Sequence, residues 1–218
     1  MASESEQFFV LLSGGIGTSH DTEMLEADPV VLGDAPRCDA CGLYIGGRPW
    51  LAPHRVELTL HGAHWGDFAF RTSGGEDMLM SERAAVRYRD AGLTGLAGFE
   101  EVEVSRIRGT SEAPPGYVHV AVQRGTAAVD EKSSKLIRAE APTCSRCRSA
   151  TLEGIRGFAI ESGTWSGEDV FFARGLTGTV VVSPRFADFV AEQRLSNVRF
   201  APIESYIWDP YAPVSADS

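Results

Sequence analysis

Four cysteines, arranged as two pairs, restrict what this chain can fold into more than any other feature. Cys38 and Cys41 stand in "RCDACG", Cys144 and Cys147 stand in "TCSRCRS", and the sequence contains no other cysteine. A spacer of two residues lets both sulfur atoms of a pair bind one metal ion. Two such pairs supply four soft ligands, and a long connection between them adds little to the entropy of closure. We therefore predict one shared structural Zn²⁺ per chain.

The residues around the pairs refine this prediction. Gly42 follows the first pair directly, where a glycine relaxes the backbone turn around a metal. Arg148 stands at that place after the second pair, so its turn must be built differently or with a less permissive residue. A disulfide or merely buried thiols stay open as alternatives. Redox chemistry fits less well, because neither pair starts a helix that would lower a thiol pKa. Four thiolates also close the coordination sphere and disfavour a catalytic zinc.

Composition and charge narrow the class of protein. The chain has 218 residues, of which 43% are hydrophobic and 23% charged, so it can bury a real core without covalent cross-links. Its net charge of −10 opposes binding to nucleic acid or to an anionic membrane surface. No stretch is long and apolar enough for a membrane helix, and the first residues carry glutamates where a signal peptide needs positive charge. We expect a cytoplasmic protein without membrane contact.

The pattern of apolar residues predicts an α+β fold of mostly antiparallel strands with two main helices. "SERAAVRYRDAG" predicts one helix, with Ser81 as N-cap and Gly92 as its stop, and "SPRFADFVAEQRL" predicts the other, capped by Ser183. The acidic segment 20–29 is read as a loop, residues 71–76 as a turn, and the C-terminal tail as loose at its end. Strands are expected at residues 6–13, 55–60, 67–70, 77–80, 99–107, 117–123, 134–141, 157–162, 169–173, 179–182 and 197–205.

Two segments of the chain share one residue pattern at a fixed spacing. "DFAFRTSGGEDMLMSER" aligns with "DVFFARGLTGTVVVSPR" at a constant offset of 102 positions, as between Asp67 and Asp169. Ser81 aligns with Ser183 in the same register, and a tryptophan precedes each segment. We predict a single zinc-stapled domain over residues 1–218, with an internal duplication whose halves span about 36–125 and 142–206.

No catalytic constellation can be assembled from the sequence. His61 and His64 have the spacing of metal ligands, but no carboxylate lies at a helical interval from them, so a surface role is expected. His20, His54 and His119 are isolated in the sequence. The glycine-rich "SGGIG" and "SGGED" lack the strand, helix and lysine of a phosphate-binding loop. We therefore predict that the protein is not an enzyme.

A basic cluster near the second cysteine pair keeps one other class of function open. Arginines 138, 146, 148 and 156 would suit a zinc ribbon that grips phosphate. No aromatic residue is interleaved there as a stacking platform, so we expect a solvated edge that balances nearby glutamates. A zinc-ribbon nucleic-acid-binding or regulatory protein is the alternative function. A thiol-dependent oxidoreductase is the third possible function.

The two cysteine pairs, "CDACG" and "CSRCR", together with the block "FARGLTGTVVVSPRFADFVAEQRLSNVRFAPIES", resemble the double-CXXCG motif proteins. Some members of that family are immunity proteins against swarming-inhibition toxins that pass between neighbouring bacteria. The resemblance runs from about Arg37 to Tyr206 and departs from the family at Arg148, where the motif has glycine.

The resemblance implies a cytoplasmic, non-enzymatic protein that binds one cognate protein toxin and blocks it. The residues that carry over from the family are structural: Cys38, Cys41, Gly42, Cys144 and Cys147. An acidic surface would complement a basic toxin and speed association. The stretches "EMLEADP", "FEEVEV" and "ESYIWDPY" are candidates for contact with it, although no single residue is assigned as a partner site.

Overall fold

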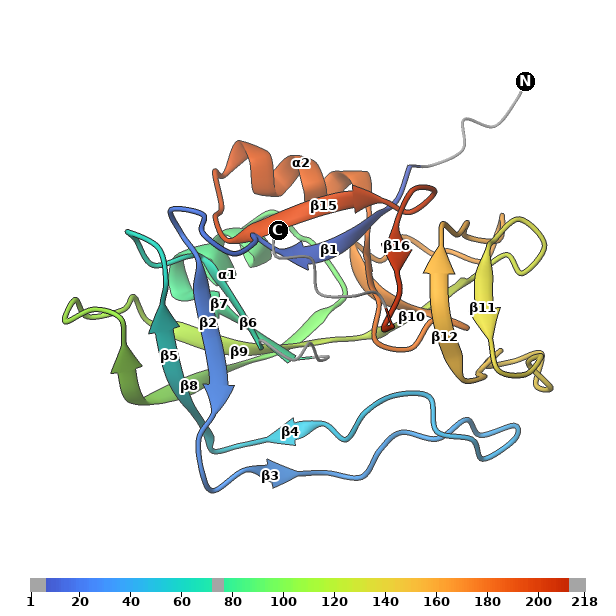
Figure 1. The fold of residues 1–218 in the computed structure, drawn as a ribbon, viewed down its shortest axis with the longest axis horizontal. Helices are drawn as coiled ribbons and strands as arrows, with labels where there is room; N and C mark the ends of the chain where they lie inside the picture. Colours follow the sequence, from blue (N-terminus) through green and yellow to red (C-terminus); the bar gives the residue numbers. More distant parts are fainter. Residues whose placement is uncertain (1–6, 72–76, 212–218) are drawn as a thin grey trace.

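Strands dominate the structure of this chain (Figure 1). The computed structural model describes residues 7–71 and 77–211. Strands make up 40% and helices 9%, so the predicted α+β class with two main helices is wrong and the protein is mostly β. The turn predicted at 71–76 and the end of the tail fall largely outside the described residues. Within them, no helix is both long and apolar enough to cross a membrane.

Six strands from the first half of the chain form a closed barrel in the order β2-β5-β8-β9-β7-β6. Most neighbouring strands are antiparallel, but β2 with β6 and β5 with β8 are parallel. Small and medium apolar side chains such as Val56, Leu58 and Leu79 fill its interior. The six strands are β2 (Thr22–Glu26), β5 (His54–Leu60), β6 (Phe68–Arg71), β7 (Asp77–Ser81), β8 (Leu96–Arg108) and β9 (Tyr117–Val122).

A five-stranded sheet in the order β10-β13-β14-β1-β15 combines the N-terminal strand β1 with four strands that follow the barrel in the sequence. Its strands are β1 (Phe9–Ser13), β10 (Arg124–Ala128), β13 (Val170–Arg174), β14 (Val180–Val182) and β15 (Val198–Pro202). A three-stranded sheet packs beside it, with β11 (Leu136–Arg138), β12 (Leu152–Arg156) and β16 (Ile207–Trp208). The hairpin of β3 (Val31–Leu32) and β4 (Trp50–Leu51) runs along one edge of the molecule (Figure 1).

The two helices lie where the sequence predicts them, but each has only nine residues. They are α1 (Glu82–Asp90) and α2 (Pro184–Glu192). The hydroxyls of Ser81 and Ser183 accept a hydrogen bond from the first turn, as expected of N-caps. Both helices bury one face in a shared apolar cluster with strands of the barrel and of the five-stranded sheet. Because nine residues cover little of either sheet, contacts between strands determine the fold class.

One strand that closes the barrel was predicted to be a loop. β2 pairs antiparallel with β5 and parallel with β6, and so joins the two ends of the curved sheet. Met24 is its one long apolar side chain that points inward, whereas Leu25 is exposed and two glutamates flank them. This weak alternation explains the wrong prediction. Residues 157–162, predicted to form a strand, do not form one: they have an isolated bridge between Ile160 and Val129 and separate backbone hydrogen bonds to neighbouring segments.

Strands β6 and β7 with α1 and β8 correspond to β13 and β14 with α2 and β15 at the offset of 102 positions. In the first set, the hydroxyl of Ser81 donates to Oδ1 of Asp67 at 2.8 Å. In the second, the hydroxyl of Ser183 donates to Oδ1 of Asp169 at 2.9 Å. The equivalent residues thus make equivalent bonds. Their origin in an internal duplication stays a prediction.

The same two carboxylates also bind the opposite half. Oδ2 of Asp67 accepts from the backbone N–H of Ser196 at 3.0 Å, and Oδ2 of Asp169 accepts from that of Thr94 at 2.9 Å. Ser196 and Thr94 are themselves 102 positions apart, so the hydrogen bonds between the two halves are reciprocal. Both aspartates are buried. Each half therefore supplies the loop that completes the hydrogen bonds of the other.

Candidate metal centre

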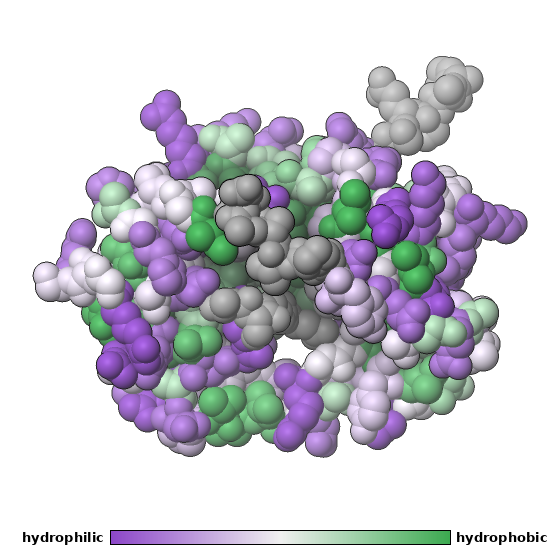
Figure 2. Space-filling model, viewed as in Figure 1, coloured by the Kyte–Doolittle hydropathy of each residue, from purple (hydrophilic) through white to green (hydrophobic). Residues whose placement is uncertain are grey.

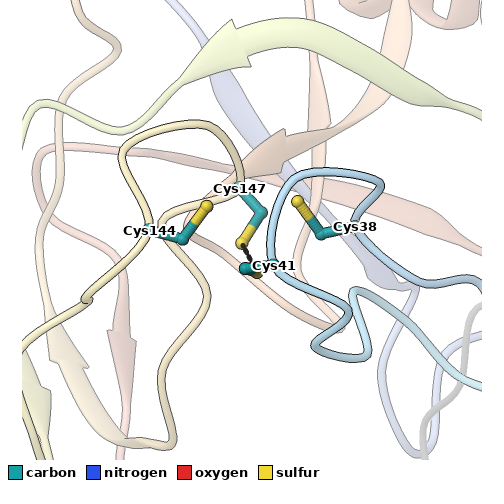
Figure 3. Close-up of side chains that lie close together, drawn as sticks. All are labelled: Cys38, Cys41, Cys144 and Cys147. Atoms are coloured by element: carbon teal, nitrogen blue, oxygen red, sulfur yellow. Dashed lines mark hydrogen bonds between the residues drawn. The ribbon is translucent and has the colours of Figure 1, made fainter.

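The structure brings all four cysteines together, from two loops that are distant in the sequence (Figure 3). Their Sγ atoms all lie within 4.8 Å of one another, and those of Cys41 and Cys147 are 3.7 Å apart. A tetrahedral zinc with bonds of about 2.3 Å requires sulfur atoms roughly 3.8 Å apart. A disulfide requires about 2.05 Å, and all four thiols are free. The cluster can therefore hold a metal ion.

The two cysteine loops have the same backbone turn. The N–H of Gly42 donates to the carbonyl of Cys38 at 2.7 Å, and the N–H of Arg148 donates to that of Cys144 at 2.9 Å. Gly42 has a φ of 75° and Arg148 a φ of 53°, both in the left-handed region. The sequence left open whether the turn after the second pair is built differently or has a less permissive residue. The structure shows the same turn in both loops, with Arg148 as the less permissive residue. We call the two loops, residues 37–44 and 143–149, the hooks.

Interactions of the Arg148 side chain explain how a non-glycine residue holds this conformation. A left-handed backbone costs an ordinary residue roughly 1–2 kcal/mol. The guanidinium donates to the carbonyl of Val129 at 2.8 Å and forms an ion pair with Glu161. These contacts fix the second hook to the neighbouring sheet. They offset a strain that the first hook avoids with glycine.

Backbone N–H groups point at the sulfur atoms and prepare them for a cation. Hydrogen bonds from the N–H groups of Cys147 and Arg146 lower the pKa of Cys144 to about 7. The N–H of Leu43 acts in the same direction on Cys41, but burial and the three other thiols outweigh it and raise that pKa to about 12. The proton of Cys144 thus leaves easily, whereas that of Cys41 is retained by burial and by hydrogen bonding among the thiols. A divalent cation bound by the sulfur atoms would favour their deprotonated form.

Contacts outside the thiols also join the two hooks. The hydroxyl of Ser149 donates to the carbonyl of Tyr44 at 3.2 Å. Arg146 forms an ion pair with Asp39 at 2.9 Å, but both side chains are well exposed, so its contribution is small. Arg174, from β13, donates to the carbonyl of Arg146 at 3.1 Å. Nothing local in the sequence indicates these partners, because each pair joins segments far apart.

A cavity of about 160 Å³ lies beside the cysteines, between the hooks and the five-stranded sheet. Its wall is largely apolar and basic. Arginine stays protonated and cannot act as a general base, and the one carboxylate in the wall, Asp39, is already in the ion pair with Arg146. The surroundings of the cysteines thus suit a structural centre. The lining residues are Cys38, Asp39, Ile45, Arg124, Gly125, Arg146, Cys147, Ser149, Phe172, Ala173, Arg174, Gly175, Leu176 and Thr177.

The arginines of the basic cluster each have an acidic partner. The pairs are Arg138 with Glu131, Arg146 with Asp39, Arg148 with Glu161 and Arg156 with Asp209. Phosphate binding requires basic groups that can turn toward the backbone of a nucleic acid. The four arginines are balanced by nearby carboxylates as the sequence predicts, but only Arg146 and Arg156 are solvated, since the Arg138 side chain is 7% exposed and that of Arg148 is 23% exposed.

Two histidines that are isolated in the sequence are stacked in the structure. The rings of His54 and His119 lie 4.1 Å apart, and Trp50 packs edge-on against both. Both histidines are buried. Nε2 of His54 lies 2.9 Å from Glu100, and Nε2 of His119 lies 2.8 Å from Asp77. Stacked rings do not direct their nitrogen atoms at one ion, so this pair is a packing feature of the barrel.

This pair predicts a dependence of stability on pH. Burial, followed by repulsion from His119, lowers the pKa of His54, and the carboxylates of Glu100 and Asp77 offset this only in part. The unfolded chain then binds the proton more readily than the folded chain, so stability falls as the pH drops below about 6.5. We expect His54→Gln to reduce the loss of unfolding free energy between pH 7.5 and pH 5.5, measured by urea denaturation.

A matched control is available for that measurement. His61 is half-exposed beside Glu23, as the sequence predicts for a surface histidine. His61→Gln should leave the loss between the two pH values as large as in the unmodified protein. An equal loss in the unmodified chain and in His54→Gln would show that the stacked pair does not cause it.

Comparison with known proteins agrees with the structure. A model of the immunity protein family (Imm11) matches residues 72–205, more than half of the chain. The match contains the second hook and both helices and begins after the first hook. None of the curated proteins compared with this chain matches it. The resemblance to an immunity family, drawn from the cysteine pairs and the C-terminal block, is confirmed. The chain belongs to the Imm11 family of immunity proteins.

Proposed function

We propose that this protein binds one cognate protein toxin and blocks it, and that the cysteine cluster holds one structural zinc ion. The match to the immunity family over residues 72–205 carries the first part of the proposal. Immunity proteins act by occupying a toxin, and this requires no chemistry of their own. The absence of an open ligand position in a four-thiolate centre agrees with a protein that is not an enzyme. We place its action in the cytoplasm.

The residues present fit a zinc ion. Cys38, Cys41, Cys144 and Cys147 would hold it, with sulfur spacing and N–H···S hydrogen bonds of the kind that a thiolate centre needs. The ion would supply a cross-link between the hooks and no reaction. The hooks themselves form the backbone turns that orient the sulfur atoms. They also connect the β3–β4 hairpin to the second half of the molecule.

The charge of the protein supports a basic toxin as its partner. The net charge of −10 favours encounter with a positively charged surface and raises the association rate. The same charge, with the arginines near the second hook paired to carboxylates, argues against the nucleic-acid-binding alternative.

Co-expression tests the function directly. The probes are toxin domains of secreted bacterial proteins, each produced in a host that it arrests, and any that is encoded beside this gene is tried first. We expect the intact chain to restore growth and to form a 1:1 complex that survives size-exclusion chromatography. A copy that stops before Cys144, and so lacks the second half, should do neither. Continued arrest with no complex, despite folded and soluble protein, would contradict the proposal. Salt-dependent binding to DNA in its place would favour the zinc-ribbon alternative.

A further inference from the structure

Residues 27–53 form an arm that is fixed to the rest of the protein at both ends. At one end, Trp50 of β4 is buried against the stacked histidines of the barrel. At the other end, the first hook meets the second hook at the cysteine cluster. The space-filling view shows an opening between this arm and the body of the protein (Figure 2). The arm therefore spans the molecule as a strap with an accessible outer side.

Apolar side chains are concentrated on the arm. Val31 and Leu51 are direct cross-strand partners, so they share one face of the hairpin. Both are about 40% exposed, at 39% and 43%. Exposed apolar groups that gather on one element mark interaction sites more often than scattered ones do. The exposed large apolar side chains of the arm are Val30, Val31, Leu32, Leu43, Tyr44 and Leu51.

A partner would contact the side chains of the arm rather than pair with the backbone edge of β3. Arg48 donates to the carbonyls of Leu32 and Gly33 at 3.0 and 2.9 Å. The carbonyl of Leu32 in β3 is therefore already occupied and is not free to accept from an added strand. A partner would thus pack on Val31 and Leu51 instead of extending the sheet.

Charges on the arm indicate which chemistry the partner has. The carboxylates of Asp28 and Asp34 are exposed and have no ion-pair partner among the described residues. The two arginines of the arm are turned back onto it, with Arg37 bound to the carbonyl of Gly42 and Arg48 capping β3. A partner surface with an apolar strip flanked by lysine or arginine would complement this arrangement.

The range of the family match points to the same segment. An immunity protein must distinguish its own toxin from others, and such discrimination is a difference in affinity between partners. The match spans residues 72–205, so the β3–β4 hairpin, which carries Val31 and Leu51, lies outside the segment that the family model matches. The arm is held at both ends, so little conformational freedom would be lost on binding.

From these observations we propose that the outer face of the arm, centred on Val31 and Leu51, is the surface on which the cognate toxin docks, through an apolar strip flanked by basic side chains. This inference rests on the proposed immunity function and names the surface that performs it. The metal centre then has a second role, because it fixes the position of one end of the docking surface.

The test compares two double variants that remove exposed apolar groups. Val31→Ser with Leu51→Ser changes the arm, and Val86→Ser with Ile207→Ser removes two comparably exposed groups elsewhere. The probe is the purified toxin domain that the co-expression experiment identifies, and binding is measured by calorimetry. We expect the arm variant to lose at least tenfold in affinity and the control variant less than threefold. Circular dichroism and metal content should match the unmodified protein in both.

The outcomes separate this inference from the function on which it rests. Binding by the unmodified chain with equal affinity in the arm variant would overturn the docking surface and leave the immunity function intact. No binding by the unmodified chain would overturn both. Hydrogen exchange gives an independent readout, since residues 27–53 should become protected in the complex. If the free chain is a dimer that the arm variant converts to a monomer, the face is occupied by a second copy and the proposal is wrong.

Discussion

Cys144→Ser is expected to empty the entire cysteine cluster of metal and to lower the melting temperature by about 10 °C or more. Three remaining thiolates cannot close a tetrahedral site, so both hooks lose their cross-link. Structural zinc contributes roughly 10–16 kcal/mol of apparent binding free energy in small peptides. Loss of even about 3–5 kcal/mol shifts the midpoint of a chain this size by about 10 °C. Elemental analysis of protein purified without a metal-affinity tag, together with calorimetry, measures both quantities.

The neighbouring Ser145 provides the matched control. It lies within the same hook, it is exposed, and its side chain makes no hydrogen bond in the described structure. Ser145→Ala should retain one zinc per chain and an unchanged melting temperature. Metal that persists at full stoichiometry in Cys144→Ser would mean that the pairs do not share one ion. A thiol that reacts rapidly with an alkylating agent before any chelator is added would favour thiol chemistry.

Asp67→Ala is expected to destabilise the protein by about 2–4 kcal/mol, because it leaves several donors without an acceptor. Asp67 accepts from Ser81, from Arg83 and from both the N–H and the hydroxyl of Ser196. Burial alone would raise its pKa, but these bonds, led by that from Arg83, outweigh burial and hold the pKa below its usual value. Because the folded pKa is depressed, this contribution is present at neutral pH and disappears as the pH falls through that pKa.

Asp188 supplies the control for that substitution. It is exposed on α2, and none of the described residues is hydrogen-bonded to its side chain. Asp188→Ala should change the free energy of unfolding by less than about 0.5 kcal/mol. Urea denaturation at pH 7 measures both variants. A loss of unfolding free energy below about 1 kcal/mol in Asp67→Ala would show that the hydrogen bonds between the two halves contribute little to stability. Faster amide exchange at Ser196 should accompany the expected loss, since its acceptor is gone.

The elements that the sequence predicts correctly are those determined by local signals. The helices after Ser81 and Ser183 begin at caps and end within a few residues of their predicted stops. The barrel could not be predicted, because its closure depends on which strands pair. That choice rests on β2, where one inward Met24 between glutamates gives almost no alternation. The prediction of the fold class therefore failed because the fold class depends on which distant segments pair.

The candidate site shows the same division. Spacing within each cysteine pair is a local signal, and it predicted the four residues that the structure brings together. The turn after Cys147 could not be predicted, because Arg148 is held in the left-handed region by contacts with Val129 and Glu161, which are distant in the sequence. The stacking of His54 on His119 likewise arises from the barrel and leaves no mark on the sequence around either residue.

The place of β1 in the five-stranded sheet has a consequence for protein synthesis. β1 lies between β14 and β15, and Phe9 is paired with both Val182 and Pro202. A nascent chain leaving the ribosome already carries β1 at Ser13, but neither neighbour exists until β14 begins at Val180. Contacts of such long sequence separation form slowly, and exposed strands are prone to aggregate meanwhile. The five-stranded sheet therefore cannot be completed until β14 and β15 have been synthesised, and its earliest strand is among the last to be enclosed.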